Sequence, residues 1–311
     1  MKHVVVSLLN YNGKKNTLDC LESLKNVKRD NFKLTIVVVD NASTDGSLKE
    51  IQNAKFKMQN HNLKVEIIGN KMNLGFSGGH NVTIRYGLEN EADYVLILNN
   101  DTYVDENFLE ELLKVAEEDS KIGILIPKIY FAPGFEYHKD RYSKNEIGKV
   151  FWYAGGKMDW ANVVGHHRGV DEVDEGQFDK TEETELATGC CMLIKKEVFK
   201  NVGLFDDKYF LYYEDSDLSI RAKSKGFKIV YVPNSIIWHK NARSAGGSGS
   251  KLQDYYITRS RLLFGFRYAP IRSKFALFRE SLGILFRGRQ WQKKGVLDFY
   301  KGTLGKGSFK I

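Results

Sequence analysis

Cysteine is scarce in this sequence: the 311 residues include three, and these form no pattern. Cys190 and Cys191 are adjacent in a strand-like segment, where neighbouring side chains point to opposite faces, and Cys20 lies in a helix-like segment. An odd, unpatterned set favours reduced thiols over a disulfide framework. We therefore expect a cytoplasmic protein.

The sequence also lacks any uninterrupted apolar run of about 18 residues, so we expect no membrane-spanning helix. The short apolar run near its start gives way at once to Asn10, Tyr11 and Asn12, and no small-residue cleavage site follows. This pattern is typical of a first strand rather than of a signal peptide. With 42% hydrophobic residues, the chain can bury the core of one large domain, with or without an extension.

Positive charge is concentrated at one end of the chain. Residues 251–311 contain 14 Lys and Arg against three Asp and Glu, whereas residues 1–250 contain 33 against 36. A basic tail suits an anionic surface, either nucleic acid or the inner leaflet of a membrane. A solvated, charged C-terminal face would have the same composition.

Strand-like and helix-like segments alternate over the first 126 residues. The strand-like segments cover residues 3–9, 33–40, 64–70, 93–101 and 122–127. The first of them is continuously apolar, as buried parallel strands are. The helix-like segments between them cover residues 15–27, 43–54, 76–90 and 106–119. This alternation predicts an open, doubly wound α/β layer with right-handed crossovers.

The pattern changes after residue 127. Residues 128–185 are rich in Gly, aromatic residues, His and Asp, and predict an irregular excursion with short antiparallel pieces. A strand and a helix return over residues 185–199 and a helix covers residues 216–226. A further strand is expected to stop at Pro233, and helical segments run from residue 251 to the end.

Polar side chains stand where four of the predicted parallel strands end: Asn10-Tyr11-Asn12, Asp40-Asn41, Asn70-Lys71 and Asn99-Asn100-Asp101. Asn and Asp are common in turns, but ligands of open α/β sheets bind beyond the carboxyl ends of the strands, so four converging ends favour a binding site. The sequence has no P-loop and no G-x-G-x-x-G after its first strand. A divalent cation on Asp101 could hold a phosphate instead, because Mg²⁺ and Mn²⁺ combine one or two carboxylates with substrate phosphates.

Five segments, in this order, carry a family resemblance: VVVSLLNYNG, VVVDNASTDGS, NLGFSGGHN, LILNNDTYVDENFL and YEDSDLSIRAKSKGFKIVYVPNSIIWHK. With YAGGKMDW, GHHRGVDEVDEGQFD and ATGCCMLI, they resemble the motifs of family-2 glycosyltransferases with a GT-A fold, in the bacterial rhamnosyltransferase-like branch. The likeness covers residues 3 to about 265. It implies a GT-A type, mostly parallel sheet in a catalytic domain over residues 1–250, followed by a basic helical extension over residues 251–311. Within that domain, residues 1–126 would form the nucleotide-sugar-binding half and residues 127–250 the acceptor and catalytic half.

The resemblance implies a metal site at the end of the fourth strand. Asn99-Asn100-Asp101 takes the place of the family's D-x-D motif, with Asn99 at its first Asp and Asp101 at the position that binds the metal directly. His239 matches a histidine that closes the metal site in related enzymes, although a histidine bonded to a strand-end carbonyl is the alternative. Mn²⁺ or Mg²⁺ is the implied ion, and Asn99 removes one negative charge beside it.

The resemblance also implies contacts to a nucleotide sugar. Asp40 would accept the N3–H of uracil or thymine, and Tyr11 would stack on that base. The other implied contacts are Asn73, Gly75, Gly79, Asn99, Asn100, Thr188 and Gly189, with the glycines permitting close backbone approach.

Three carboxylates, Glu214, Asp215 and Asp217, open a predicted helix, where the helix dipole favours negative charge. Capping is therefore the plain alternative to a catalytic role, and it suits Asp217. The resemblance implies that Asp215 is the base of an inverting displacement and that Glu214 is a neighbour of the acceptor or the sugar. We expect the charge of Glu214 to raise the proton affinity of Asp215.

In the tail, Phe275, Phe278, Leu282 and Leu285 share one predicted helical face among arginines and lysines. This pattern is typical of an amphipathic helix that lies on anionic lipid, and a helix packed on the catalytic domain is the alternative. Nucleic acid is not an expected partner, since no recognised motif accompanies the charge. The Gly- and Ser-rich residues 242–251 are a candidate lid or a passive linker.

The sequence thus predicts an inverting, metal-dependent glycosyltransferase, peripheral on the inner face of the plasma membrane. It would move a sugar, with rhamnose as the first candidate, from a UDP- or dTDP-sugar to a saccharide acceptor that is lipid-linked. A sugar-nucleotide nucleotidyltransferase is one alternative, although NYNGKKN is a poor version of the loop it needs. A non-catalytic carbohydrate-binding protein on a decayed transferase fold is another, supported by Asn99.

Overall fold

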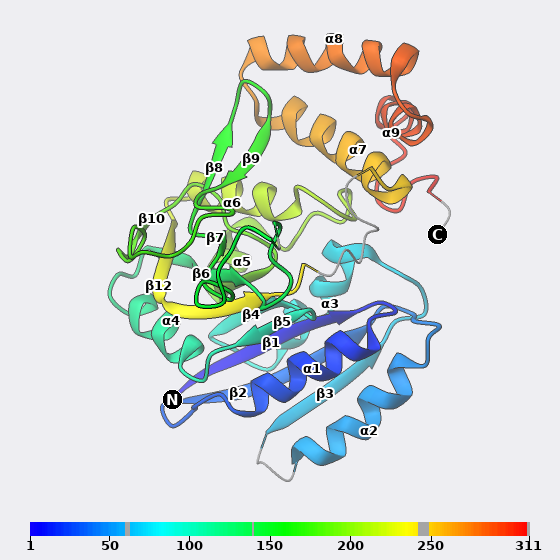
Figure 1. Ribbon diagram of the computed structural model, residues 1–311. Coiled ribbons are helices and arrows are strands. Elements are labelled where there is room, and N and C mark those ends of the chain that lie inside the picture. The colour runs from blue at the N-terminus through cyan, green and yellow to red at the C-terminus, as the bar shows by residue number, and fades with distance from the viewer. Residues whose placement is uncertain (60–62, 139, 242–248, 310–311) are drawn as a thin grey trace.

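The computed structural model describes residues 1–59, 63–138, 140–241 and 249–309 (Figure 1). Its main sheet contains β1 (Lys2–Asn10), β2 (Phe32–Asp40), β3 (Lys64–Gly69), β4 (Tyr94–Asn99), β5 (Thr102–Val104), β6 (Ile122–Phe131), β7 (Phe151–Tyr153), β10 (Glu182–Glu183), β11 (Cys191–Lys195) and β12 (Lys228–His239). The order across the sheet is β10-β12-β6-β11-β4-β1-β2-β3, with β5 paired to β12 and β7 to β6. The expected doubly wound, mostly parallel α/β sheet is confirmed.

The N-terminal part of the sheet is built on four parallel strands. β1 pairs with β2 and β4, and β2 pairs with β3. The register places Asn10 opposite Asp40 and Leu9 opposite Asn99. The polar strand ends therefore meet at one edge of the sheet, as the sequence predicts.

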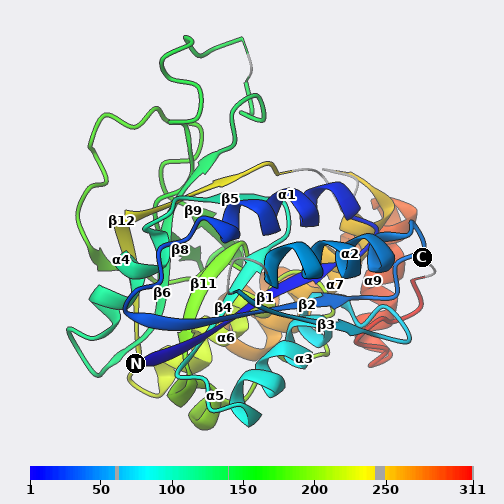
Figure 2. The same ribbon diagram turned by 90° about the horizontal axis from the view of Figure 1, so that it is seen from below.

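Helices cover both faces of this sheet. They are α1 (Lys14–Lys25), α2 (Ser47–Gln59), α3 (Gly75–Glu89), α4 (Phe108–Ala116), α5 (Lys196–Val202) and α6 (Glu214–Ser224). Figure 2 shows α1 and α2 on one face and α3 and α5 on the other. Leu21 and Leu24, from the predicted apolar stripe of α1, are buried in the main core. Burying such stripes against the sheet is what stabilises this architecture.

The sheet continues beyond β4 with a change of direction. β11 lies antiparallel between β4 and β6, whereas β6 and β12 run parallel to each other. The expectation that the last strand stops at Pro233 was wrong, because β12 continues to His239 across an irregularity between Val232 and Ile236. Proline has no N–H to give to the ladder, so the strand is interrupted locally instead of ending. The continuation pairs His239 with Thr102 of β5.

The described residues between β6 and β11 form the irregular excursion, which the sequence predicts over residues 128–185. It starts later than predicted because β6 continues to Phe131. Apart from β7 and β10, it holds the short antiparallel pair β8 (Gly156–Asp159) and β9 (Val164–His167). The three cysteines are free and buried, as expected for reduced thiols. Residues 242–248, most of the candidate lid, lie outside the described residues.

Three helices, α7 (Lys251–Tyr268), α8 (Ile271–Arg287) and α9 (Gln290–Tyr300), complete the described chain. Figure 1 shows them stacked over the end of the molecule where α6 lies. α7 is largely buried, and with α9 it packs in apolar clusters that include Tyr209 and Phe210. No helix of the described residues is long and apolar enough to cross a membrane.

α8 differs from its neighbours because one row of its apolar residues faces outward, although Leu277 is buried. Phe275, Phe278 and Leu282 of the predicted face are 65%, 43% and 39% exposed. Leu285 is instead partly buried in an apolar cluster, and Phe286 is 81% exposed. Three of the four residues predicted to form the exposed apolar face therefore lie on it, and Leu285 does not.

Candidate active site

Asp40 and Asn10 lie side by side at the ends of β2 and β1. The side-chain amide of Asn10 donates to Asp40 Oδ2 over 2.7 Å, and the backbone N–H of Ser43 donates to Asp40 Oδ1 over 2.9 Å. Asp40 is only 2% exposed, so these two bonds fix its carboxylate. Tyr11, the next residue along from Asn10, is 38% exposed at the same edge.

The loop from Asn70 to Gly75 is held by a residue whose role the sequence analysis did not identify. The Asn41 amide donates to Asn73 Oδ1 and to the carbonyl of Gly75, over 2.9 and 3.1 Å. Its oxygen accepts from Leu74 N and from Asn70 Nδ2, both over 3.0 Å. The sequence signal for Asn41 was its position directly after β2. A polar residue there indicates a binding site, but it does not show that this residue holds the neighbouring loop.

Gly75 and Gly79 lie near protein groups in positions that exclude a side chain. Gly75 has φ +73°, and a Cβ there would come within 2.3 Å of the Phe210 carbonyl oxygen. A Cβ at Gly79 would come within 2.4 Å of Leu9 of β1. These glycines therefore let α3 pack closely on β1 and on the segment before α6. Contact of either with a nucleotide stays a prediction.

Asn99, Asn100 and Asp101 follow β4 as expected. The Asn100 amide turns toward α1 and donates to Thr17 Oγ1 over 2.8 Å. Asp101 lies beside His239, with Oδ1 and Nε2 3.1 Å apart. The backbone also joins them, because the Lys240 N–H donates to the Asp101 carbonyl over 2.9 Å. The extension of β12 past Pro233 is what brings this imidazole to the carboxylate.

The Asp101–His239 pair suits a divalent cation that takes its other ligands from a diphosphate. Two neighbouring ligands of an octahedral ion at about 2.0–2.1 Å lie roughly 3 Å apart, close to the 3.1 Å between these atoms. Both side chains are buried, and His239 Nδ1 has no hydrogen-bond partner in the described part of the chain. Among the described residues, no three His, Cys, Asp or Glu are grouped to hold a metal ion. Any ion here would therefore depend on the substrate for most of its ligands.

An aromatic wall that the sequence analysis did not assign lies against His239. The Trp152 ring packs edge-on against His239 and His167, with centroids 4.6 and 4.7 Å away, and His167 also contacts Tyr153. Burial lowers the pKa of His167 to about 4, so this imidazole is neutral at physiological pH. The sequence signal for His167 was the histidine pair in GHHRG.

Asp215 and Glu214 begin α6, as predicted. Asp215 Oδ2 accepts the Gly189 N–H over 2.9 Å and Oδ1 accepts the Ser216 N–H over 2.7 Å. Burial raises the pKa of the Asp215 carboxyl, although these N–H groups oppose the shift. The direction agrees with the expectation, but its main cause is burial rather than Glu214. Burial and the charge of Asp215 hold the pKa of Glu214 well above its usual value. Within the part of the chain that the structure describes, Glu214 Oε2 has no hydrogen-bond partner.

A short stretch of backbone joins the two halves of the site. Gly189 donates to Asp215, and the next carbonyl, that of Cys190, accepts the Asn99 N–H over 2.8 Å. Thr188 is buried in the same stretch. The structure therefore brings Asp215 and the Asn99–Asp101 turn to one edge of the sheet.

Asp217, assigned by the sequence analysis to capping, has another role. It is fully buried. It accepts from Arg221 Nε over 2.6 Å and from the Tyr268 hydroxyl over 2.7 Å. The correction has a physical reason: the fourth residue of α6 faces Tyr268 of α7, in a buried position where a carboxylate needs donors.

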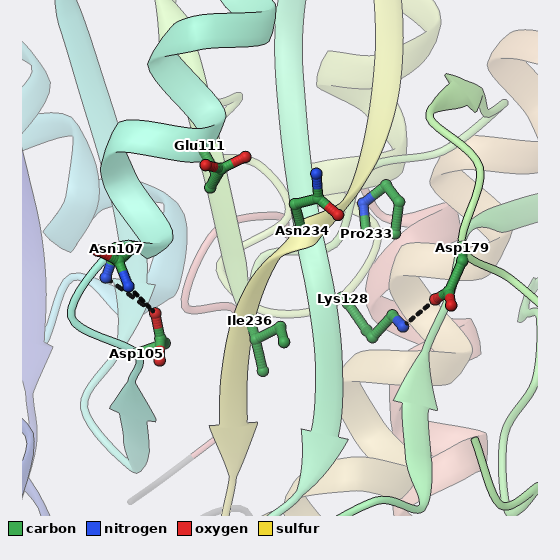
Figure 3. A pocket seen from close by; sticks show the side chains of 8 residues that line it. All are labelled: Asp105, Asn107, Glu111, Lys128, Asp179, Pro233, Asn234 and Ile236. Carbon is green, nitrogen blue, oxygen red and sulfur yellow. Dashed lines mark hydrogen bonds and ion pairs between the residues drawn. The ribbon is translucent and has the colours of Figure 1, made fainter. Parts of the chain in front are cut away.

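A cavity of about 480 Å³ lies elsewhere on the sheet. Figure 3 shows its lining, with Asp105 and Asn107 at one end and the ion pair of Lys128 with Asp179, 2.5 Å long, at the other. None of the predicted site residues lines it. The candidate active site is therefore formed by the polar residues at the strand ends and not by this cavity.

Solved structures of known proteins share this fold. The chain superposes on GalNAc-T7, solved with UDP, GalNAc and Mn²⁺, with a TM-score of 0.60 over 97% of this chain and 58% of that chain, at 16% identity. It superposes on the mannosyltransferase PcManGT of Pyrobaculum calidifontis, solved with GDP-Man and Mn²⁺, with a TM-score of 0.56 over 99% and 76% of the two chains, also at 16% identity. These likenesses establish the GT-A fold.

The fold and the sequence relationships define a glycosyltransferase, and the chain belongs to glycosyl transferase family 2, whose profile matches residues 4–203. It is 28% identical over 229 residues, 68% of each chain, to the N-acetylglucosaminyl-diphospho-decaprenol L-rhamnosyltransferase of Mycobacterium tuberculosis. It is 25% identical over 293 residues, 88% of each chain, to the dTDP-rhamnosyl transferase RfbF of Shigella flexneri. Family membership decides against the nucleotidyltransferase alternative.

Proposed function

We propose that this enzyme transfers a sugar, with L-rhamnose as the first candidate, from a UDP- or dTDP-sugar to a lipid-linked saccharide, with inversion. The observation that carries the proposal is the meeting of the Asp101–His239 pair and Asp215 at one sheet edge, linked through Gly189 and Cys190. The names of the two rhamnosyltransferase relatives support the choice of sugar, and the first of them supports a lipid-linked acceptor.

Asp215 is the group that takes the proton. As the acceptor hydroxyl oxygen forms a bond to the anomeric carbon, the bond from that carbon to the diphosphate breaks on the opposite face. The hydroxyl proton passes to the Asp215 carboxylate, and the nucleoside diphosphate leaves with the electron pair. A buried carboxylate with a raised pKa is a stronger base than an exposed one, which suits this step.

Asp101 and His239 would hold Mn²⁺ or Mg²⁺. A divalent ion there would supply Lewis-acid stabilisation of the negative charge on the leaving diphosphate. Because Asn99 is uncharged, Asp101 is the one carboxylate of this motif. The diphosphate itself would therefore provide much of the negative charge that retains the ion.

Asp40 is the residue that tests the donor class. Asp40→Ala removes the acceptor proposed for the base N3–H, so we expect the affinity for UDP and dTDP to fall about tenfold, the effect of losing ~1.4 kcal/mol. Isothermal titration with each nucleotide and Mn²⁺ measures this. Asp105→Asn, four residues beyond Asp101 and in the separate cavity, is the matched control. Unchanged affinity on Asp40→Ala would reject the assigned base contact.

We also propose that the basic extension brings the enzyme to the anionic inner face of the plasma membrane. α8 carries the surface that fits: Ile271, Phe275, Phe278, Leu282 and Phe286 recur at helical spacing and are all exposed. Arg272 and Arg279, each the residue directly after a member of this stripe, are exposed along one side of it. The acidic Glu280 on the same helix is paired with Arg261. An apolar stripe bordered by arginines is complementary to acyl chains beneath anionic headgroups.

Vesicle binding tests this docking surface. The double variant Phe275→Ser, Phe286→Ser should bind vesicles of phosphatidylcholine with 30% phosphatidylglycerol more than about tenfold more weakly. The reason is that each aromatic side chain gains about 1.5 kcal/mol or more of free energy when it moves from water into lipid. Leu297→Ser, an exposed residue of α9, is the control. Equal sedimentation of the double variant and wild type, or a stripe-dependent dimer on gel filtration, would contradict a membrane partner.

A further inference from the structure

The segment that leads into α6 has an unusual backbone. Phe210, Tyr212 and Tyr213, three of the four residues before Glu214, have φ of 64°, 66° and 70°. Side chains larger than that of glycine rarely adopt this left-handed conformation, so neighbouring contacts must hold the segment in place. Its shape sets where Glu214 and Asp215 begin the helix.

α7 supplies the contacts that hold this segment. The Tyr256 ring stacks on Phe210 with centroids 4.9 Å apart and 16° between the planes. Ser260 Oγ donates to the Leu211 carbonyl over 3.0 Å. Between them in sequence, Arg259 donates to the Tyr209 carbonyl over 3.1 Å. All three side chains lie on one face of the helix.

Arg259 is the centre of this contact and is fully buried. Its hydrogen-bond partners among the described residues are carbonyl oxygens and one hydroxyl: those of Tyr209, Lys208, Thr303 and Gly305, and the Tyr255 hydroxyl. Its guanidinium also lies 5.1 Å from the ring centroids of both Tyr255 and Tyr256. A buried guanidinium that fixes backbone carbonyls on two segments acts as a clamp, because its planar fork sets their relative positions.

We infer that Arg259 is a positioning residue for the base: it fixes Lys208 and Tyr209, and through the strained turn it fixes the start of α6. This inference rests on the proposed role of Asp215. The residue lies outside the matched family profile, which ends at residue 203, and belongs to the extension rather than to the sheet. The extension thus has a catalytic consequence that is separate from the membrane surface on α8.

The test compares Arg259→Gln and Arg259→Lys with Arg261→Gln as the matched control. Arg261 is on the same helix and also donates to a backbone carbonyl, that of Asn162, but it pairs with Glu280 of α8 instead of approaching the turn. Transfer from dTDP-L-rhamnose to N-acetylglucosaminyl-diphospho-polyprenol gives kcat and KM. Titration with dTDP and Mn²⁺ gives the fraction of binding-competent molecules.

We expect Arg259→Gln to lower kcat per binding site about 100-fold, the cost of a misplacement of about 1 Å, with the KM for the donor within about twofold of wild type. Arg259→Lys, which keeps the charge but not the fork, should recover part of kcat, and Arg261→Gln should match wild type. Wild-type kcat per binding site in both Arg259 variants would overturn the inference. Loss of dTDP binding in both would do so too, because the role would then be structural alone.

Asp215→Asn in the same assay separates the two levels of the proposal. If Asp215→Asn is inactive while the Arg259 variants turn over normally, only the inference about Arg259 fails. If Asp215→Asn retains turnover, the assignment of the base fails first.

Discussion

Replacing Asp215 by Asn should lower kcat about 1,000-fold and leave dTDP and UDP affinity within about twofold, because an amide keeps the shape of the carboxylate but cannot take the acceptor proton. The amide oxygen can still accept one of the two N–H bonds, from Gly189 or Ser216, so the start of α6 should survive. Steady-state kinetics with paired nucleotide titrations measure the result. Turnover near the wild-type value would show that another group takes the proton.

The pH dependence of kcat gives a second view of the same carboxylate. The base must be ionised to act, and burial raises its pKa, so kcat should rise with pH through a value above the ordinary aspartate value of about 3.9. Below that value the carboxyl is protonated and kcat is lost. Asp215→Asn should have no such acidic limb in its residual activity, whereas the control Asp105→Asn should keep it.

Replacing Asp101 by Asn should cost about 1,000-fold in kcat with Mn²⁺ present, since the charge that would hold the ion against the leaving diphosphate is lost and metal stabilisation amounts to several kcal/mol. The Mn²⁺ concentration that gives half-maximal rate should rise as well. Asp101 and Asp105 lie on either side of the short strand β5. As the control, Asp105→Asn should behave as wild type. Equal Mn²⁺ dependence in Asp101→Asn and wild type would place the ion elsewhere.

His239→Ala in the same assay distinguishes the two interpretations of that residue. If His239 is a metal ligand, its removal should raise the Mn²⁺ concentration needed for activity. If His239 only packs on Trp152, its removal should lower the stability of the protein without changing that concentration.

Much of the parallel N-terminal part of the sheet could be predicted from the sequence, because buried parallel strands and their polar ends are local patterns. The register of Asn10 with Asp40 follows once those strands are placed side by side. The pairing of His239 with Asp101 could not be derived in this way. It depends on β12 continuing past Pro233, where tertiary pairing with β6 overrides the local tendency of proline to end a strand.

The C-terminal region was harder to predict because composition does not say which side of a helix is covered. Arg259 and Arg272 contribute equally to the basic charge of the tail, yet the first is fully buried on carbonyl oxygens and the second is exposed on α8. The inward position of Asp217 was likewise hidden, since its partners Tyr268 and Arg267 come from a helix about 50 residues later. Long-range contacts of this kind leave no short-range signal.

The central claim is that one diphosphate lies between Asp101 and Asp215. An anomalous difference map from a crystal grown with dTDP and Mn²⁺ tests it most directly. The account predicts a manganese peak within ligand distance of Asp101 Oδ1 and His239 Nε2, with the β-phosphate between that peak and Asp215. A peak at the Lys128–Asp179 cavity, or a nucleotide bound away from the strand ends, would contradict it.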